Sequence, residues 1–194
     1  MTIYTKLFTP SDDHTVLLYA RKLNIPHPGT QTLLSWAEFG FGIELLMQQI
    51  RGAGSRFEVD AVIGINEAGL SIAAFLSGGL MHRCPIGFIR NDSKTIREEW
   101  LPSVNSVKSV LLVDVEIKSG STLKAALQII RKWIKPKRVF FACLGAQVNS
   151  TSIGTEIRLN ELEAYQIIRK SRLAGFFVAL IGPRPSLEPP LYLD

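Results

Sequence analysis

From residue 59 onward, short apolar runs alternate with stretches that have helical periodicity. Five mostly apolar runs have the length of a β-strand, and they span residues 59–65, 86–90, 107–113, 138–144 and 176–181. Helical patterns follow three of them, over residues 69–78 and 121–134 and before the last run. A strand that is apolar along its whole length has to be covered on both faces. The alternation therefore predicts an α/β fold with a doubly wound, mostly parallel sheet flanked by helices.

The region before residue 59 gives weaker signals. Residues 25–29 contain two prolines and a glycine and should form a loop. Residues 32–50 have apolar positions at helical spacing, although Gly40 and Gly42 leave room for a break. We divide the chain into an N-terminal segment, 1–55, and a core, 56–194.

The last part of the core should contain one more helix, one more strand and a proline-rich tail. Asn160 with Glu163 has the spacing of a helix N-terminal cap, and Gly175 is placed to end that helix. The strand over 176–181 then completes the sheet, and the prolines that follow predict an extended segment.

Composition indicates the kind of compartment in which the protein works but does not indicate its function. Hydrophobic residues make up 46% of the 194 residues, which is ample for a packed core, and the formal charge is +5. A mild positive excess suits anionic small ligands, although scattered surface Lys and Arg explain it equally well. Cys84 and Cys143 lack a CxxC spacing, which favours buried free thiols in a reducing compartment. We expect a cytoplasmic protein with no membrane segment, because no apolar stretch approaches the ~20 residues of a span.

The most informative segment spans residues 110–123, VLLVDVEIKSGSTL. An apolar strand ends near Asp114, and a turn rich in Gly, Ser and Thr leads into an amphipathic helix. The first N–H groups of a helix have no partner inside the helix, and the helix dipole favours negative charge there. Such a turn is suited to hold a phosphate group. The alternative is an ordinary helix cap, since Ser, Thr and Gly are common at that position.

This segment resembles the phosphoribosyl pyrophosphate (PRPP) signature of type I phosphoribosyltransferases, in which a strand, two consecutive acids and a phosphate-binding turn follow each other. The resemblance implies that family's fold, with a small N-terminal hood. It also implies that Asp114 contacts the ribose. The 5-phosphate would bind to the turn, which consists of Lys118, Ser119, Gly120, Ser121 and Thr122.

The segment departs from the family pattern at two positions. Val115 stands where the second acid is expected, and an acid follows one residue later at Glu116. Side chains alternate along a strand, so Glu116 takes the missing position only if the strand ends early. Lys118 replaces the usual Thr and is similar to the Lys of purine repressors that have this fold and do not turn PRPP over.

Two other segments extend the resemblance. Residues 60–76 resemble the strand, loop and helix that bind pyrophosphate, which assigns that role to Asn66, Glu67, Ala68 and Gly69. Residues 89–104 resemble the mobile loop that closes over pyrophosphate, in which Arg90 and Lys94 would stabilise the leaving group. The alternative interpretation is that this polar stretch is an ordinary solvent-exposed loop without a role in binding.

These segments lead to two hypotheses about function. The first is an enzyme that moves the 5-phosphoribosyl group of PRPP to a nucleobase, either orotate or a purine, with release of pyrophosphate. Asp114, Glu116 and Lys94 are its candidate catalytic residues; Mg²⁺ would arrive with PRPP, and no protein ligand is assigned to it directly. The second is a regulator with the same fold that binds PRPP or a nucleotide without turnover.

Partners follow from the same resemblance. A nucleic acid partner is expected only for the regulator, although residues 1–55 show no helix-turn-helix pattern. We expect a homodimer, since many family members dimerise. Binding of another nucleotide by an unrelated α/β fold is a third possibility, but the chain has neither GxxxxGK[ST] nor a GxGxxG after a strand.

Overall fold

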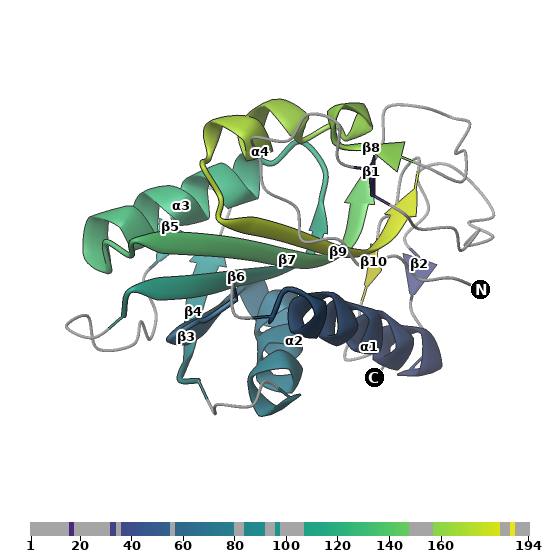
Figure 1. Cartoon of the computed structure of the whole chain (residues 1–194), viewed down its shortest axis with the longest axis horizontal. Coiled ribbons are helices and arrows are strands. Elements are labelled where there is room, and N and C mark those ends of the chain that lie inside the picture. Colours follow the sequence, from purple (N-terminus) through teal and green to yellow (C-terminus); the bar gives the residue numbers. More distant parts are fainter. Residues whose placement is uncertain are drawn as a thin grey trace.

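The structure is a computed structural model (Figure 1). It describes residues 36–54, 57–79, 84–91, 107–147 and 157–182, together with the short strand segments 16–17, 32–33, 96–97 and 187–188. The N-terminal forty residues and the proline-rich tail therefore lie largely outside the described part, and the division of the chain at residue 55 stays a prediction. Within the described part, no helix is both long and apolar enough to cross a membrane.

A central parallel sheet organises the described residues. Its strand order is β5-β4-β3-β6-β7-β9, and only the two-residue β5 is antiparallel to its neighbour. β3 lies between β4 and β6, so the chain leaves β3 in one direction to form β4 and returns on its other side to form β6. The strand bounds are β3 Ala61–Ile65, β4 Ile86–Asn91, β5 Ile96–Arg97, β6 Ser109–Ile117, β7 Arg138–Gln147 and β9 Gly175–Gly182.

Helices cover both faces of this sheet (Figure 1). α1 (Trp36–Gly52) and α2 (Asn66–Gly79) lie on one face, and α3 (Ser121–Trp133) and α4 (Tyr165–Lys170) lie on the other. Two hydrophobic clusters result, one on each face, because alternate residues of each central strand point to opposite sides. The doubly wound α/β fold expected from the sequence is confirmed.

Two short strand pairs lie outside the central sheet, and β5 adds a short strand at its edge. β1 (Val16–Leu17) pairs antiparallel with β8 (Ile157–Arg158), and β10 (Leu187–Glu188) pairs in parallel with β2 (Thr32–Leu33). β5 pairs with the end of β4. Segments from both ends of the chain are thus brought against each other and against the core's last third.

The helix predicted over residues 32–50 begins later and is not broken. Residues 32–33 are β2, and α1 then runs without interruption from Trp36 to Gly52. Gly42 has a packing reason, because a Cβ there would lie 2.8 Å from Leu144 Cδ2 on β7. The glycine that suggested a break instead lets α1 approach the sheet closely.

The expected cap of the last helix is also wrong. Asn160 lies in a 3₁₀ turn, Leu159–Glu161, and α4 starts only at Tyr165 with Ala164 as its N-cap and no side-chain cap bond. α4 ends at Lys170, and Gly175 is the first residue of β9. The spacing of Asn160 and Glu163 fits a helix cap, but Asn160 lies within a short 3₁₀ turn and Glu163 follows that turn.

Two glycines set how closely α2 packs on the sheet. A Cβ at Gly64 in β3 would lie 2.4 Å from the Cα of Leu70, and one at Gly69 would lie 2.5 Å from the carbonyl oxygen of Val113 in β6. Both contacts are with backbone atoms, which have little freedom to move aside. The first turn of α2 therefore rests directly on the end of β6, next to Asp114.

This contact predicts opposite effects for two Gly→Ala substitutions in the same helix. Gly69→Ala should destabilise the fold by about 2–3 kcal/mol, because the methyl group overlaps backbone atoms of β6. Gly78→Ala, which has nothing within 4 Å, should stabilise it by about 0.5–1 kcal/mol through helix propensity. Urea unfolding of both variants measures this, and equal effects would contradict the proposed contact.

Candidate functional site

β6 supplies the acids of the site and continues further than the sequence suggested. It extends to Ile117, so Asp114, Val115 and Glu116 are all strand residues. Val115 is 9% exposed and packs in the cluster beneath α1 and α2. Asp114 and Glu116 are two residues apart and point to the opposite face. Because the strand does not end early, Glu116 does not take the position that Val115 leaves without an acid.

Asp114 is almost completely buried. Its side chain is 8% exposed, and Oδ1 accepts a hydrogen bond from the N–H of Val115 over 2.8 Å. Burial raises the pKa of Asp114 to about 7; the bond from Val115 lowers this pKa and the nearby charge of Glu116 adds to its rise. Near neutral pH the carboxyl group can therefore accept or donate a hydrogen bond.

The predicted phosphate turn connects β6 to α3. Residues 118–120 bend the chain, and α3 begins at Ser121. Ser119 Oγ lies 3.2 Å from Ser121 Oγ and accepts from the Ser121 N–H over 3.4 Å. Two hydroxyl groups are thus gathered at the amino end of a 13-residue helix, where the dipole attracts anions.

The structure explains why glycine occupies position 120, which the sequence alone did not reveal. Gly120 is the N-cap of α3 and adopts φ 79°, a left-handed conformation that favours glycine. A Cβ at this position would lie 3.0 Å from Ile167 Cβ and 3.3 Å from Ala164 Cβ. The missing side chain lets α4 pack against the turn, so substitution of Gly120 would disturb the fold as well as any ligand.

Lys118 and Glu116 form an ion pair at the mouth of the site. Lys118 Nζ lies 2.7 Å from Glu116 Oε1, with the Lys side chain 45% exposed and the Glu side chain 19% exposed. The cation that the sequence assigned to the phosphate is therefore paired with a carboxylate. An anion that binds to Lys118 has to compete with Glu116.

A cavity of about 290 Å³ joins these groups. Its lining is mainly polar and includes Asn66, residues 114–123 and Phe141. The cavity lies where the carboxyl ends of β3 and β6 meet, and this is the point at which the chain reverses direction across the sheet. Open α/β sheets bind ligands at such switch points. The volume is at the small end for ligand pockets and fits a sugar phosphate better than a whole nucleotide.

Only one of the residues predicted to bind pyrophosphate reaches this cavity. Asn66 lines it, and its φ of 57° places it in a conformation that costs energy for a side chain other than glycine. The loop expected at residues 66–69 is in fact the first turn of α2, which starts directly after β3. Gly69 serves the contact with Val113 described above.

Glu67 and Arg90 form an ion pair with each other and do not line the cavity. Arg90 NH2 lies 2.7 Å from Glu67 Oε1, and both side chains are half exposed. Ala68 does not line the cavity either. The carboxylate of Glu67 is thereby partly neutralised by a cation from β4. Lys94 lies outside the described residues.

The site has two carboxylates but no preformed metal centre in the described part of the chain. No group of three or more His, Cys, Asp or Glu side chains comes together there. Magnesium prefers carboxylate, phosphate and water oxygens and commonly uses only one or two protein ligands. Asp114 and Glu116 fit that pattern only when a ligand supplies further oxygens.

The chain belongs to the phosphoribosyl transferase domain family, whose sequence pattern it matches over residues 29–152. This range contains β3, α2, β6, the turn at 118–120 and α3. A comparison with curated protein sequences gives no match. The family assignment confirms the resemblance on which the sequence analysis relied.

Solved structures show the same fold at low sequence identity. Purine phosphoribosyltransferase from Pyrococcus horikoshii superposes with a TM-score of 0.59 and 18% identity, over 84% of this chain and 94% of that chain. The xanthine-guanine-hypoxanthine phosphoribosyltransferase of Helicobacter pylori gives 0.60 and 17%, over 85% and 95%. A hypothetical protein from Neisseria gonorrhoeae with bound ppGpp gives 0.57 and 19%, over 84% and 91%.

Sequence reasoning missed Phe141, which lines the cavity, and Cys143, which lies next to Asp114 in the sheet without lining the cavity. Phe141 of β7 pairs with Leu112 of β6 and forms part of the cavity floor. Its apolar strand pattern gave no hint of this, because floor residues look like core residues. Cys143, which pairs with Asp114 across the sheet, is fully buried, and burial raises the pKa of its thiol. Both residues are near the site because β7 pairs with β6, a contact that the sequence of either strand does not reveal.

The burial of Asp114 predicts a pH-dependent stability. The pKa of Asp114 is raised in the folded state, so its ionisation removes stability as pH increases from about 4 to about 7. Asp114→Asn should become progressively more stable than wild type across that window, by about 1.4 kcal/mol for each unit of pKa difference. Urea unfolding of both proteins at several pH values tests this. A constant difference would contradict a raised pKa.

The ion pair at the cavity mouth predicts a gain of anion affinity. Glu116→Gln should bind inorganic phosphate about two- to fivefold more tightly, because Lys118 no longer has a competing carboxylate and a half-exposed pair is worth about 1 kcal/mol or less. Calorimetric titration with phosphate measures the change. An unchanged or weaker affinity would mean that Lys118 and Glu116 do not compete with the ligand.

Proposed function

We propose that this protein transfers the 5-phosphoribosyl group of PRPP to a nucleobase and releases pyrophosphate. The observation that carries the proposal is the cavity in which a phosphate-binding turn and two carboxylates meet at the switch point of the sheet. In this proposal the 5-phosphate binds to residues 118–122, and its charge is balanced by Lys118 and the amino end of α3.

Catalysis of this reaction requires mainly positioning and electrostatics. The anomeric carbon gains positive character as pyrophosphate leaves, so a group that holds the ribose in line accelerates the step. Asp114 lies at the cavity wall within β6 and is placed to hold a ribose hydroxyl. Its raised pKa permits it to do so as an acceptor or a donor near neutral pH. Glu116 is the second carboxylate on the same face and completes the candidate catalytic set with Lys94.

Magnesium and pyrophosphate belong to the same proposal. When bound, Mg²⁺ neutralises charge on the leaving group. Asp114 and Glu116 are the carboxylates that line the cavity and would bind the ion. Oxygens of PRPP would supply most of its other ligands. Asn66 lines the cavity beside the turn, whereas Arg90 would have to leave Glu67 to reach pyrophosphate.

The acceptor is a nucleobase, either orotate or a purine, and nothing in the cavity selects between them. Purine and orotate phosphoribosyltransferases both occur among proteins of similar fold. A homodimer in the cytoplasm is part of the proposal. The two thiols, Cys84 and Cys143, are buried and unpaired, as in proteins of a reducing compartment.

A regulator that binds the same ligand without turnover is the second candidate. The observation in its favour is Val115, which stands where the family has its second acid and is held in the apolar cluster under α2. The chain cannot gain that acid by a small movement, because β6 pairs with β7 on either side of Val115, at Asp114 and at Glu116. One carboxylate of the usual pair is therefore absent from its usual place.

Titration calorimetry with PRPP and Mg²⁺ tests the proposal, followed by a pyrophosphate assay with orotate, adenine, guanine, hypoxanthine and xanthine in turn. Lys118→Met should weaken PRPP binding by about tenfold, as expected for a charge-assisted bond to phosphate. Lys124→Met is the matched control. It removes an equal charge from α3 at a residue that does not line the cavity, and should bind as wild type does.

The outcomes separate the candidates. Pyrophosphate release with one base identifies the enzyme and its acceptor. Tight PRPP binding without release for any base identifies the regulator. Binding that is absent, or equally sensitive to both lysine substitutions, would mean that the turn is an ordinary helix cap. Gly120 variants are unsuitable here, because the turn and α4 pack together at that residue.

A further inference from the structure

Two turns of the structure carry a basic residue where the backbone favours glycine. Lys135 follows α3 with φ 53°, and Arg172 follows α4 with φ 51°. The Lys135 N–H donates to the carbonyl of Ile130 and closes the end of α3. A side chain in this left-handed conformation costs about 1 kcal/mol or more relative to glycine. Attraction to the helix dipole offsets part of that cost, but glycine would serve the backbone better at both turns.

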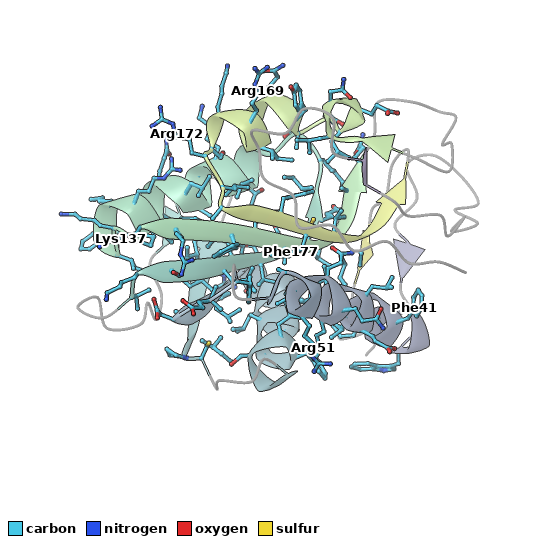
Figure 2. The ribbon with its side chains drawn as sticks, in the orientation of Figure 1. Phe41, Arg51, Lys137, Arg169, Arg172 and Phe177 are labelled. Atoms are coloured by element: carbon cyan, nitrogen blue, oxygen red, sulfur yellow. The ribbon has the colours of Figure 1, made fainter. Side chains whose placement is uncertain are left out.

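These two residues belong to a larger basic face. Arg131 of α3 donates to the Ser171 carbonyl and holds the ends of α3 and α4 together. In Figure 2, Arg169 and Arg172 point outward on the α3 and α4 side of the sheet, and Lys137 lies at the start of β7. The basic face consists of six exposed residues, Lys132, Lys135, Lys137, Arg169, Lys170 and Arg172.

Few acids oppose this charge. The sequence has no Asp or Glu between Glu116 and Glu156, and none between Glu163 and Glu188. Near the start of the strands, Glu58 lies 3.5 Å from Arg138, and Asp60 accepts from the N–H groups of Lys108 and Ser109. Glu161 and Glu163 directly precede α4. The basic face therefore has a positive potential, which attracts anionic polymers.

An exposed aromatic ring lies within the face. Trp133 is 44% exposed at the end of α3, and Lys132 Nζ lies 4.8 Å from the centre of its ring. Tyr165 on α4 has the guanidinium of Arg169 at 6.0 Å. Surfaces that bind single-stranded nucleic acid combine cations that track the phosphates with aromatic rings on which bases stack.

We propose that the basic face binds single-stranded nucleic acid, with phosphates on its Lys and Arg side chains and a base stacked on Trp133. A membrane surface fits less well. A helix that lies on a membrane needs an exposed apolar face, whereas the apolar residues of α3, such as Leu123, Leu127 and Ile130, are buried in the core. Among the described residues of α3, Trp133 is the one large apolar side chain that is exposed and could insert.

Lys137 and Arg172 lie at the opposite end of the strands from the cavity, whereas Arg169 and Lys170 belong to α4, whose Ile167 faces Gly120 of the phosphate turn. The phosphate turn follows the carboxyl end of β6, whereas Lys137 directly precedes β7 and Arg172 lies in the turn before β9. A nucleic acid held on Lys135 and Arg172 therefore leaves the cavity free for PRPP. The inference does not depend on whether the protein turns PRPP over.

Fluorescence anisotropy with labelled oligouridylate and oligothymidylate, at two salt concentrations, tests the inference. The double variant Lys135→Gly/Arg172→Gly should bind at least about tenfold more weakly. Its salt dependence should be shallower by about 1.4 in log–log slope, because about 0.7 is lost for each phosphate contact with a single strand. Glycine suits both turns, so its unfolding free energy should stay equal or rise. Trp133→Ala should lose about fivefold, and Trp133→Tyr less.

Controls make the result decisive. Arg51→Gln removes one charge from α1, on the other side of the sheet, and Lys135→Arg/Arg172→Lys keeps the charge; both should bind as wild type does. PRPP should not displace the oligonucleotide. The inference is overturned if wild type binds no oligonucleotide, if Arg51→Gln loses as much as the double variant, or if PRPP competes. Binding to phosphatidylserine vesicles but not to oligonucleotides would also overturn it.

Discussion

The parallel pairing of β6 with β3 on one side and β7 on the other determines where every group of the candidate site lies. β6 is paired with β3 as far as Val113 and with β7 as far as Ile117, and its apolar side chains alternate between the two clusters from Val110 to Val115. That alternation sends Val115 into the cluster under α2 and brings Asp114 and Glu116 to the opposite face. The turn that follows then opens at the edge where β3 also ends, and Asn66 joins it from there.

The same pairing accounts for the electrostatics of the site. Because β6 is central, Asp114 is removed from water, and burial raises the pKa of its carboxyl group. One residue pair further along, Glu116 is partly exposed and engages Lys118. The cavity thus contains a carboxyl group whose pKa is about 7 and a cation that is paired with Glu116. An anionic ligand changes both, because it draws Lys118 away from Glu116 and adds negative charge beside Asp114.

The sequence predicted those features that depend on local patterns. The apolar strands, the helices between them and the turn after β6 follow from periodicity and from Gly, Ser and Thr at a helix start. Features that depend on contacts between distant segments were beyond it. Gly120 faces Ile167 of α4, and Gly42 faces Leu144 of β7, so neither glycine's reason is visible in its neighbours along the chain. The sequence analysis placed Asn66 in a loop. In the structure its positive φ joins β3 directly to α2, so no separate loop is needed.

The basic face illustrates the same limit. No dense basic run occurs in the sequence, yet residues from the end of α3, the start of β7 and the end of α4 share one surface.

An NMR titration of the labelled protein with ribose 5-phosphate tests the central claim, the phosphate-binding turn, most directly. The account predicts that the largest amide shifts fall on residues 118–122, with smaller shifts at Asp114 and Asn66. Shifts confined to other parts of the sheet, or none at all, would contradict it.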